Sequence, residues 1–237
     1  MNIALCQINT TVGDFDHNYD KILDNYYNCI NKNADIIVFP ELCISGYPPQ
    51  DLLFEEGFIE KNSKVLENIA IESKAPLIIG YIRKENLNIY NSAAVCYDGQ
   101  IQSTYDKVLL PTYDVFDEAR YFTSGKHPKI INIPFKGAQL KVGLQICEDL
   151  WDQEYDCKVS TIQKEMGADF IVNISASPYQ QDRLLKRKDI ILNKVQETSL
   201  PFFYCNAIGG QDELIFDGQS LAFSEEGIVI GYGTAFK

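Results

Sequence analysis

Short runs of consecutive apolar residues restrict the fold of this sequence more than any other feature. Residues 35–40 (DIIVFP) and 169–175 (DFIVNIS) lack the alternation of apolar and polar side chains that marks a strand with one face in water. A strand of this kind is covered on both faces, so helices must pack on one side of its sheet and another layer on the other. The sequence therefore predicts an α/β fold.

Strand-like and helix-like segments alternate along the chain, in agreement with that fold class. β-Rich runs predict strands at residues 2–8, 35–39, 77–82, 90–97, 100–105, 141–147, 170–175 and 202–207. Apolar residues at helical spacing predict helices around residues 22–30 and 65–69, and a third helix fits residues 183–198. The pairs Asp98-Gly99 and Glu226-Gly227 each mark a hairpin turn. Because the sequence contains no repeat and no linker-like tract, residues 1–237 are expected to form a single domain.

The charge balance speaks against two classes of partner. The formal net charge is −12, from 33 acidic and 21 basic residues. Nucleic acids and anionic membranes bind proteins through Lys and Arg, so neither is an expected partner. The one basic cluster, at residues 183–188, is expected to be a solvated helix face. No segment has the ~18 consecutive apolar residues of a membrane span. The first residues (MNIALCQINT) read as a strand and not as a secretory signal, so a cytoplasmic protein is expected.

The cysteines and histidines exclude several kinds of site. The odd number of cysteines, seven, and the absence of a CxxC pair speak against both a disulfide framework and a zinc ribbon. Cys6, Cys96 and Cys205 lie in apolar runs, which predicts buried thiols. His17 and His127 are too few and too scattered for a zinc site or for a histidine-containing triad, so no metal site is expected. The sequence contains neither GxGxxG nor GxxxxGK(S/T), which speaks against a dehydrogenase or a kinase.

A cysteine that is activated without histidine is the chemistry that remains. A free thiol has a pKa near ~8.5 and needs a base or a nearby cation to react at neutral pH. Cys147 ends an apolar strand in VGLQICEDLW, Glu41 follows the strand DIIVFP, and Lys107 ends the hairpin strand STYDK. Each residue taken alone could be a core cysteine or a surface charge at a strand end. Together they favour a catalytic site where strands end.

The order of these residues resembles that of the nitrilase or carbon–nitrogen hydrolase superfamily, with Glu in PEL, Lys in YDK and Cys in ICED. The resemblance covers essentially the whole chain. Four further motifs are similar to the amidase domain of glutamine-dependent NAD synthetases: GYPPQDLL (residues 46–53), LPTYDVFDEARYF (110–122), ICEDLW (146–151) and NISASPY (173–179). Other members of the superfamily commonly have an aromatic or small polar residue after the nucleophile, whereas this chain has Glu148 and Asp149.

The resemblance implies a nitrilase-type α-β-β-α sandwich and a role for each of the residues at the strand ends. Glu41 would be the general base, Lys107 the cation beside the oxyanion, and Cys147 the nucleophile. Glu118, in FDEARYF, would orient the lysine, although it could also be a surface charge at a helix start.

The same resemblance implies glutamine as the substrate. The residues that would bind it are Tyr113, Glu148, Ser177 and Arg183. Glu148 would face the amino group of glutamine. Arg183 suits a carboxylate because its planar fork can bind both oxygens, although it could instead belong to the solvated face of residues 183–188.

The resemblance also implies cofactors and a partner, and both belong to a synthetase domain that residues 1–237 are not expected to contain. The resemblance implies that glutamine hydrolysis needs no cofactor and that ATP and Mg serve only a synthetase domain, which would convert deamido-NAD to NAD with the released ammonia. No SGGxDS-type pyrophosphate loop occurs in residues 1–237, so these residues are not expected to make NAD themselves. The chain would be part of a longer protein or a free-standing relative. The expected partners are a synthetase domain, in cis or in trans, and further copies of this chain in a homo-oligomer.

Two other functions stay open on the sequence alone. A stand-alone amidase acting on another small amide or carbamoyl compound would keep the same Glu, Lys and Cys, but the GYPPQDLL and FDEARYF motifs favour the glutaminase. A non-catalytic scaffold would need no reactive thiol, so the joint presence of Glu41, Lys107 and Cys147 favours an enzyme.

Overall fold

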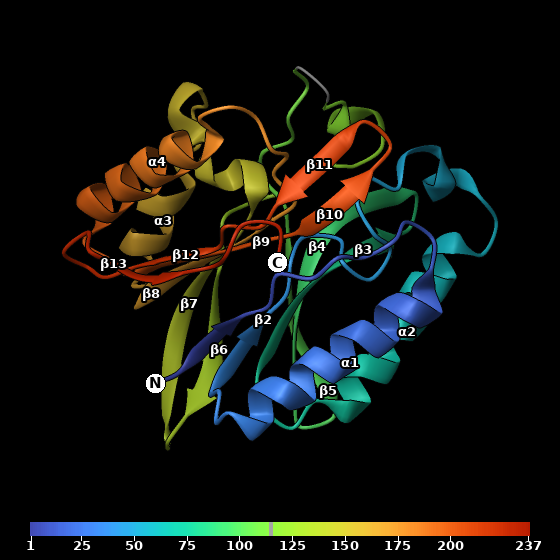
Figure 1. Ribbon diagram of the computed structural model, residues 1–237, viewed down its shortest axis with the longest axis horizontal. Helices are drawn as coiled ribbons and strands as arrows, with labels where there is room; N and C mark the ends of the chain where they lie inside the picture. The colour runs from blue at the N-terminus through green and yellow to red at the C-terminus, as the bar shows by residue number, and fades with distance from the viewer. Residues whose placement is uncertain (114–115) are drawn as a thin grey trace.

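The computed structural model describes residues 1–113 and 116–237, and within these ranges the strands form two large sheets and a separate hairpin (Figure 1). The first sheet has the order β1-β2-β3-β4-β5, parallel from β1 to β3 and antiparallel from β3 to β5. Its strands are β1 (Ile3–Leu5), β2 (Ile36–Val38), β3 (Leu77–Glu85), β4 (Asn88–Tyr97) and β5 (Gln100–Asp106).

The second sheet has the order β13-β12-β9-β8-β7-β6, with β7, β8 and β9 parallel and the outer pairs antiparallel. Its strands are β6 (Ile130–Phe135), β7 (Ala138–Ile146), β8 (Phe170–Ser175), β9 (Phe202–Asn206), β12 (Leu221–Phe223) and β13 (Val229–Tyr232). The separate hairpin pairs β10 (Ile208–Gln211) with β11 (Leu214–Asp217), and it lies at the top of the view in Figure 1.

Helices cover the outer face of each sheet (Figure 1). α1 (Phe15–Asn31) and α2 (Phe58–Glu72) pack on the first sheet, and α3 (Val159–Glu165) and α4 (Arg183–Thr198) lie over the second. Short 3-10 turns occur at η1 (Gln50–Phe54), η2 (Glu118–Arg120), η3 (Cys147–Leu150) and η4 (Asp152–Glu154). Of the helices that the structure describes, none is long and apolar enough to cross a membrane.

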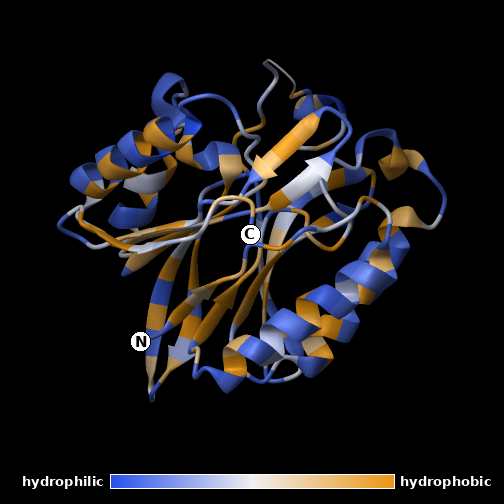
Figure 2. Ribbon diagram, viewed as in Figure 1, coloured by the Kyte–Doolittle hydropathy of each residue, from blue (hydrophilic) through white to orange (hydrophobic). Residues whose placement is uncertain are grey.

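Apolar side chains fill the space between the layers, as the three residues of β2 illustrate. Ile36 and Val38 belong to the cluster between the two sheets, which Val142 and Ile174 enter from the second sheet. Ile37, between them, belongs to the cluster shared with α1 and α2. Figure 2 shows hydrophobic strands inside and helices with hydrophilic outer surfaces. The predicted α-β-β-α sandwich is confirmed, and the apolar runs lack alternation because both faces of these strands are buried.

Periodicity and composition find the central strands and long helices but not every element. The predicted hairpins at Asp98-Gly99 and Glu226-Gly227 join β4 to β5 and β12 to β13. β6, α3 and the β10–β11 hairpin have no counterpart in the sequence prediction. α3 has only seven residues, too few for a clear helical period, and β6 contains polar Asn132 and Pro134.

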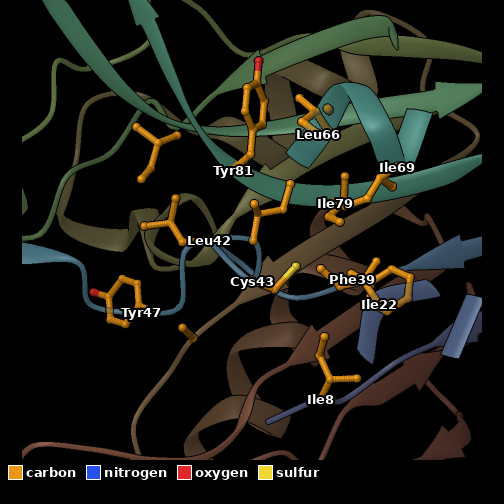
Figure 3. Packing of buried hydrophobic residues seen from close by; sticks show 14 of the residues in the cluster. Ile8, Ile22, Phe39, Leu42, Cys43, Tyr47, Leu66, Ile69, Ile79 and Tyr81 are labelled. Atoms are coloured by element: carbon orange, nitrogen blue, oxygen red, sulfur yellow. The ribbon is translucent and has the colours of Figure 1, made fainter. Parts of the chain in front are cut away.

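The loop after β2 is fixed against β3 at a glycine. The N–H of Gly80 donates to Pro40 O (3.2 Å). A Cβ at Gly80 would overlap Pro40 O and Leu42 N and would lie 2.7 Å from the carbonyl carbon of Glu41. This contact therefore determines where the backbone of Glu41 lies. The close-up in Figure 3 shows the packing around this loop, with labelled residues that include Leu42, Cys43, Tyr47, Ile79 and Tyr81.

Gly80→Ala is expected to lower the free energy of unfolding by about 1–3 kcal/mol, as overpacking of a closely packed site usually does. Urea unfolding measures this change. Gly210→Ala is the matched control, because a Cβ at this exposed glycine in β10 would meet nothing closer than Leu214 O at 3.6 Å. Equal stability of the two variants would contradict the close contact at Gly80.

Candidate active site

Glu41 lies in the loop after β2 and is buried, with 1% of its surface exposed. Its Oε1 accepts hydrogen bonds from Lys107 Nζ (2.8 Å) and Asn91 Nδ2 (2.7 Å), and its Oε2 accepts one from the backbone N–H of Ala176 (2.8 Å). Asn91 belongs to β4, Lys107 directly follows β5, and Ala176 directly follows β8. The carboxylate is therefore held by groups from both sheets.

Lys107 lies between two buried carboxylates. Besides its bond to Glu41, Nζ donates to Glu118 Oε2 (2.8 Å) and Oε1 (3.0 Å). Tyr47 OH donates to Glu118 Oε1 (3.0 Å), so the GYPPQDLL motif also reaches this cluster. Burial opposes the charge of Lys107, but Glu118 and Glu41 outweigh it and raise the pKa of Lys107 well above its ordinary value. The lysine is therefore a permanent cation at neutral pH.

Cys147 directly follows β7 and is the first residue of η3. Its φ is 41°, in the left-handed region where a side chain other than glycine is strained. The carbonyl of Cys147 accepts a hydrogen bond from Asn173 Nδ2 (3.3 Å), and the side chain is buried. The strained backbone at the strand end sets the direction of the thiol.

The surroundings of Cys147 keep its thiol protonated. Burial raises the pKa of the thiol well above its ordinary value, and Glu41 adds to this shift while Lys107 opposes it. A thiolate in the resting site would place a further negative charge beside Glu41 and Glu118. The resting site therefore holds a neutral thiol next to the carboxylate–ammonium–carboxylate cluster.

Asp149 connects the chain segment of Lys107 to that of Cys147. Its buried carboxylate accepts hydrogen bonds from the N–H groups of Val108 (3.1 Å), Leu109 (2.9 Å) and Ile146 (2.9 Å) and from the hydroxyl of Tyr105 (2.8 Å). Burial raises the pKa of Asp149 to about 6, and these hydrogen bonds oppose the shift. Because the donors flank Lys107 and precede Cys147, this single side chain links the two chain segments.

Glu148 and Tyr113, both predicted to bind substrate, contact each other. The hydroxyl of Tyr113 donates to Glu148 (3.0 and 2.9 Å to its two oxygens), and Tyr155 OH donates to Oε1 (3.0 Å). Burial raises the pKa of Glu148, whereas the ring of Tyr113 is half exposed. The pair therefore joins a buried carboxylate to a tyrosine that is accessible from outside.

Ser177 and Arg183, the other predicted substrate-binding residues, lie before and at the start of α4. Ser177 is buried, and its N–H donates to Asn206 Oδ1 (2.9 Å). The guanidinium of Arg183 lies 5.5 Å from the centre of the Trp151 ring. Its Nε is buried and has no hydrogen-bond partner among the described residues. A buried N–H of this kind is satisfied when an acceptor binds.

The basic cluster at residues 183–188 lies on a helix as predicted, but the prediction of a solvated face is wrong for Arg187. This side chain is 0% exposed, and its Nη1 donates to Asp217 Oδ1 (2.8 Å) in β11. A run of basic residues gives no sign of this burial, because the partner carboxylate is 30 residues away along the chain.

A cavity of about 330 Å³ opens beside the charged cluster. Tyr47 and Glu118 line the cavity, and so do the residues at the tip of the β10–β11 hairpin. Its charged lining residues are Asp51, Asp117, Glu118, Arg120, Asp212 and Glu213. Among the described residues Cys147 does not line it, so the cavity approaches the site from the Glu118 side. Residues 114–115 of the LPTYDVFDEARYF motif lie outside the described ranges.

The structure brings Glu41, Lys107 and Glu118 into direct contact and places Cys147 in their electrostatic field. Glu118 is buried, so its alternative interpretation as a surface charge is wrong. Sequence reasoning does not assign roles to Asn91, to Asp149 or to the N–H of Ala176. Asp149 stands in the ICEDLW motif and could be found from it, whereas a backbone N–H carries no sequence signal.

Within residues 1–113 and 116–237, no group of three or more His, Cys, Asp or Glu side chains is arranged to hold a metal ion.

Comparisons with known proteins agree with this geometry. The family model described as carbon-nitrogen hydrolase matches residues 2–237. The glutamine-dependent NAD(+) synthetase of Thermotoga maritima is 37% identical over 240 residues, which covers 100% of this chain and 40% of that protein. The glutamine-dependent NAD(+) synthetase of Aquifex aeolicus is 36% identical, with 100% of this chain and 41% of that protein covered. This chain thus spans about two fifths of the length of these curated relatives.

Solved structures show the same fold. A glutamine-dependent NAD+ synthetase from Acinetobacter baumannii, in complex with ADP, has a TM-score of 0.91 and 31% identity, and 99% of this chain and 43% of that chain are covered. An amidase from Nesterenkonia sp. has a TM-score of 0.85 at 23% identity, with 100% and 87% covered. With the strand-end cluster, the sandwich fold and a family match over residues 2–237, the chain belongs to the carbon–nitrogen hydrolase family and is an enzyme domain of that class.

Proposed function

We propose that this chain hydrolyses the side-chain amide of glutamine to glutamate and ammonia. The observation that carries the proposal is the buried contact of Lys107 with both Glu41 and Glu118, whose charges act on the thiol of Cys147. This arrangement supplies a nucleophile, a base and a cation without histidine. The names of the relatives at 36–37% identity support glutamine as the substrate.

The first step transfers the thiol proton of Cys147 to Glu41 while the sulfur attacks the amide carbon. Loss of that proton to water would add a negative charge to a buried site, which is costly. Transfer to Glu41 leaves the net charge of the site unchanged. The raised pKa of Cys147 is therefore compatible with its role as nucleophile, because the proton moves within the site when substrate is present.

The attack moves the electron pair of the carbonyl onto the amide oxygen. Lys107, kept charged by its two carboxylate partners, stabilises this oxyanion, together with a backbone N–H near Cys147. Protonated Glu41 then donates its proton to the amide nitrogen. The carbon–nitrogen bond breaks, ammonia leaves, and the acyl group stays on Cys147 as a thioester.

Glu41 also carries a proton when the thioester is hydrolysed, this time from water to the sulfur of Cys147. Glu41 takes a proton from water as the water oxygen attacks the thioester carbon, and Lys107 again stabilises the oxyanion. The carbon–sulfur bond breaks, and the proton on Glu41 returns to the sulfur. One glutamine and one water give one glutamate and one ammonia, so the cycle as written needs no cofactor.

The ends of the substrate-binding region suit the two charges of free glutamine. Glu148, held by Tyr113 and Tyr155, would bind the ammonium group. Arg183, whose Nε has no hydrogen-bond partner among the described residues, would bind the carboxylate together with Ser177. Opposite charges at fixed places select a free amino acid over a simple amide.

We further propose that the ammonia serves a synthetase domain that converts deamido-NAD to NAD, and that ATP and Mg act in that domain only. The names of the curated relatives support this partner, and this chain covers 40% and 41% of two of them. Free ammonia at neutral pH is mostly protonated and no longer nucleophilic. Direct transfer to an acceptor would therefore conserve its reactivity.

Cys147→Ala is expected to abolish glutamate release from glutamine, and Lys107→Met is expected to lower the rate by about 10²–10³ through loss of oxyanion stabilisation. Glu41→Gln should be more severe, because the base acts in both half-reactions. Glutamate release is measured with asparagine and a simple nitrile as control substrates. Near-normal release by Cys147→Ala would contradict the nucleophile, and hydrolysis of the controls but not of glutamine would favour a stand-alone amidase.

Asp149→Asn is expected to lower kcat about 10²-fold, the effect that a displacement of about 1 Å can have on a catalytic group. The amide nitrogen of asparagine would face an N–H donor, so the segments of Lys107 and Cys147 would move apart. Asp152→Asn is the control, since Asp152 is buried but pairs with Lys194 (2.6 Å) instead. Similar kcat values in the two variants would show that Asp149 does not align the site.

The chain alone is expected to hydrolyse glutamine slowly and to make no NAD when ATP and deamido-NAD are supplied. A glutaminase that feeds a partner is restrained until the partner is loaded, which is a population shift between two states. The measurement compares glutamate production by this chain with that of the chain joined to a synthetase domain whose substrates are present. Equal rates would remove the coupling and favour the stand-alone amidase.

A further inference from the structure

Helix α4 carries a fully buried guanidinium, that of Arg187. One of its nitrogens, Nη1, donates to Asp217 Oδ1 (2.8 Å). The other, Nη2, donates to the backbone carbonyls of Ser177 (2.8 Å) and Pro178 (3.3 Å) and to Ser177 Oγ (3.3 Å). One side chain of α4 therefore ties together β11 and the turn of residues 176–178.

The turn of residues 176–178 is also the turn that holds Glu41. The N–H of Ala176 donates to Glu41 Oε2 (2.8 Å), while the carbonyl of the next residue, Ser177, accepts from Arg187. Asn206 contacts the same turn, accepting from the Ser177 N–H (2.9 Å). The guanidinium of Arg187 and the carboxylate of Glu41 therefore bond to adjacent residues of one short segment.

Stability alone does not account for this arrangement. A buried ion pair is often replaced by apolar side chains of similar size without loss of stability. A lysine could pair with Asp217, but all its donors sit on one nitrogen, whereas the guanidinium presents Nη1 to Asp217 and a separate nitrogen, Nη2, to the two carbonyls. The contacts of Arg187 thus require its geometry as well as its charge.

We infer that Arg187 is a positioning residue, which sets the turn of residues 176–178 and through it the carboxylate of Glu41 and the place of Ser177. The inference deepens the proposed function, on which its kinetic readout rests. Alkylation of Cys147 gives a second readout that needs no glutamine, because the thiol must lose its proton in that reaction too.

The experiment compares Arg187→Lys with the wild-type full chain. The variant is expected to lower kcat for glutamine about 10–100-fold, as small displacements of catalytic groups do, and to raise KM because Ser177 moves. The rate at which chloroacetamide alkylates Cys147, followed by mass spectrometry, is expected to fall by a similar factor.

Lys194→Met is the matched control. Lys194 is buried on the same helix and pairs with Asp152 (2.6 Å) and Glu197 (2.8 Å), away from the turn of residues 176–178. This variant is expected to lower the melting temperature and to leave kcat, KM and the alkylation rate unchanged. A purely structural role for Arg187 would give the two variants the same pattern.

A second variant tests whether a folding defect, and not the loss of positioning, explains the result. Arg187→Met combined with Asp217→Asn removes both charges of the pair, so no unpaired charge stays buried. It also lacks the bonds to Ser177 and Pro178, so it should show the same losses of kcat and alkylation rate as Arg187→Lys.

Wild-type kcat and alkylation rates in both Arg187 variants would overturn the inference, as would equal losses in Lys194→Met. If the wild-type chain releases no glutamate while chloroacetamide still labels Cys147, the proposed function fails. The alkylation rates then decide the inference about Arg187 without it.

Discussion

A lysine ammonium and two carboxylates share one buried volume, and the rest of the molecule is arranged around that constraint. Lys107 contacts both Glu41 and Glu118 in surroundings where an unpaired charge would be very unfavourable. Asn91 and the N–H of Ala176 donate further hydrogen bonds to Glu41, and Tyr47 donates one to Glu118. Those donors come from both sheets, so the cluster forms only when the sheets are packed together.

The sequence predicts those features of the site that depend on residues close together in the chain. Apolar runs show which strands are covered on both faces, and Glu41, Lys107 and Cys147 each stand at the end of such a strand or of a hairpin. Strand ends of packed sheets converge, so residue type and position together suffice to propose the cluster. The resemblance to a known superfamily then distinguishes Glu118 from the other carboxylates of an acidic chain.

What the sequence does not reveal depends on contacts between distant segments. Arg187 stands in a basic run that is typical of an exposed helix face, yet the turn of residues 176–178 and Asp217 enclose it. The bond from Ala176 to Glu41 uses a backbone N–H, which every residue except proline has. β6 and α3 are not predicted for a different reason. Polar residues interrupt the apolar pattern of β6, and α3 is too short to show a helical period.

Glu41 and the N–H that holds it are 135 residues apart, and this separation has a consequence for a chain that is made from its N-terminus. When residues 1–113 have emerged, Glu41 and Lys107 are present, but Cys147, Asp149 and Ala176 are not. Glu41 and Lys107 are therefore synthesised before Cys147, and the thiol gains its neighbours only when the second sheet packs against the first. A nascent or half-folded chain therefore lacks the complete set of contacts around Glu41, which exists only once Ala176 and the second sheet are in place.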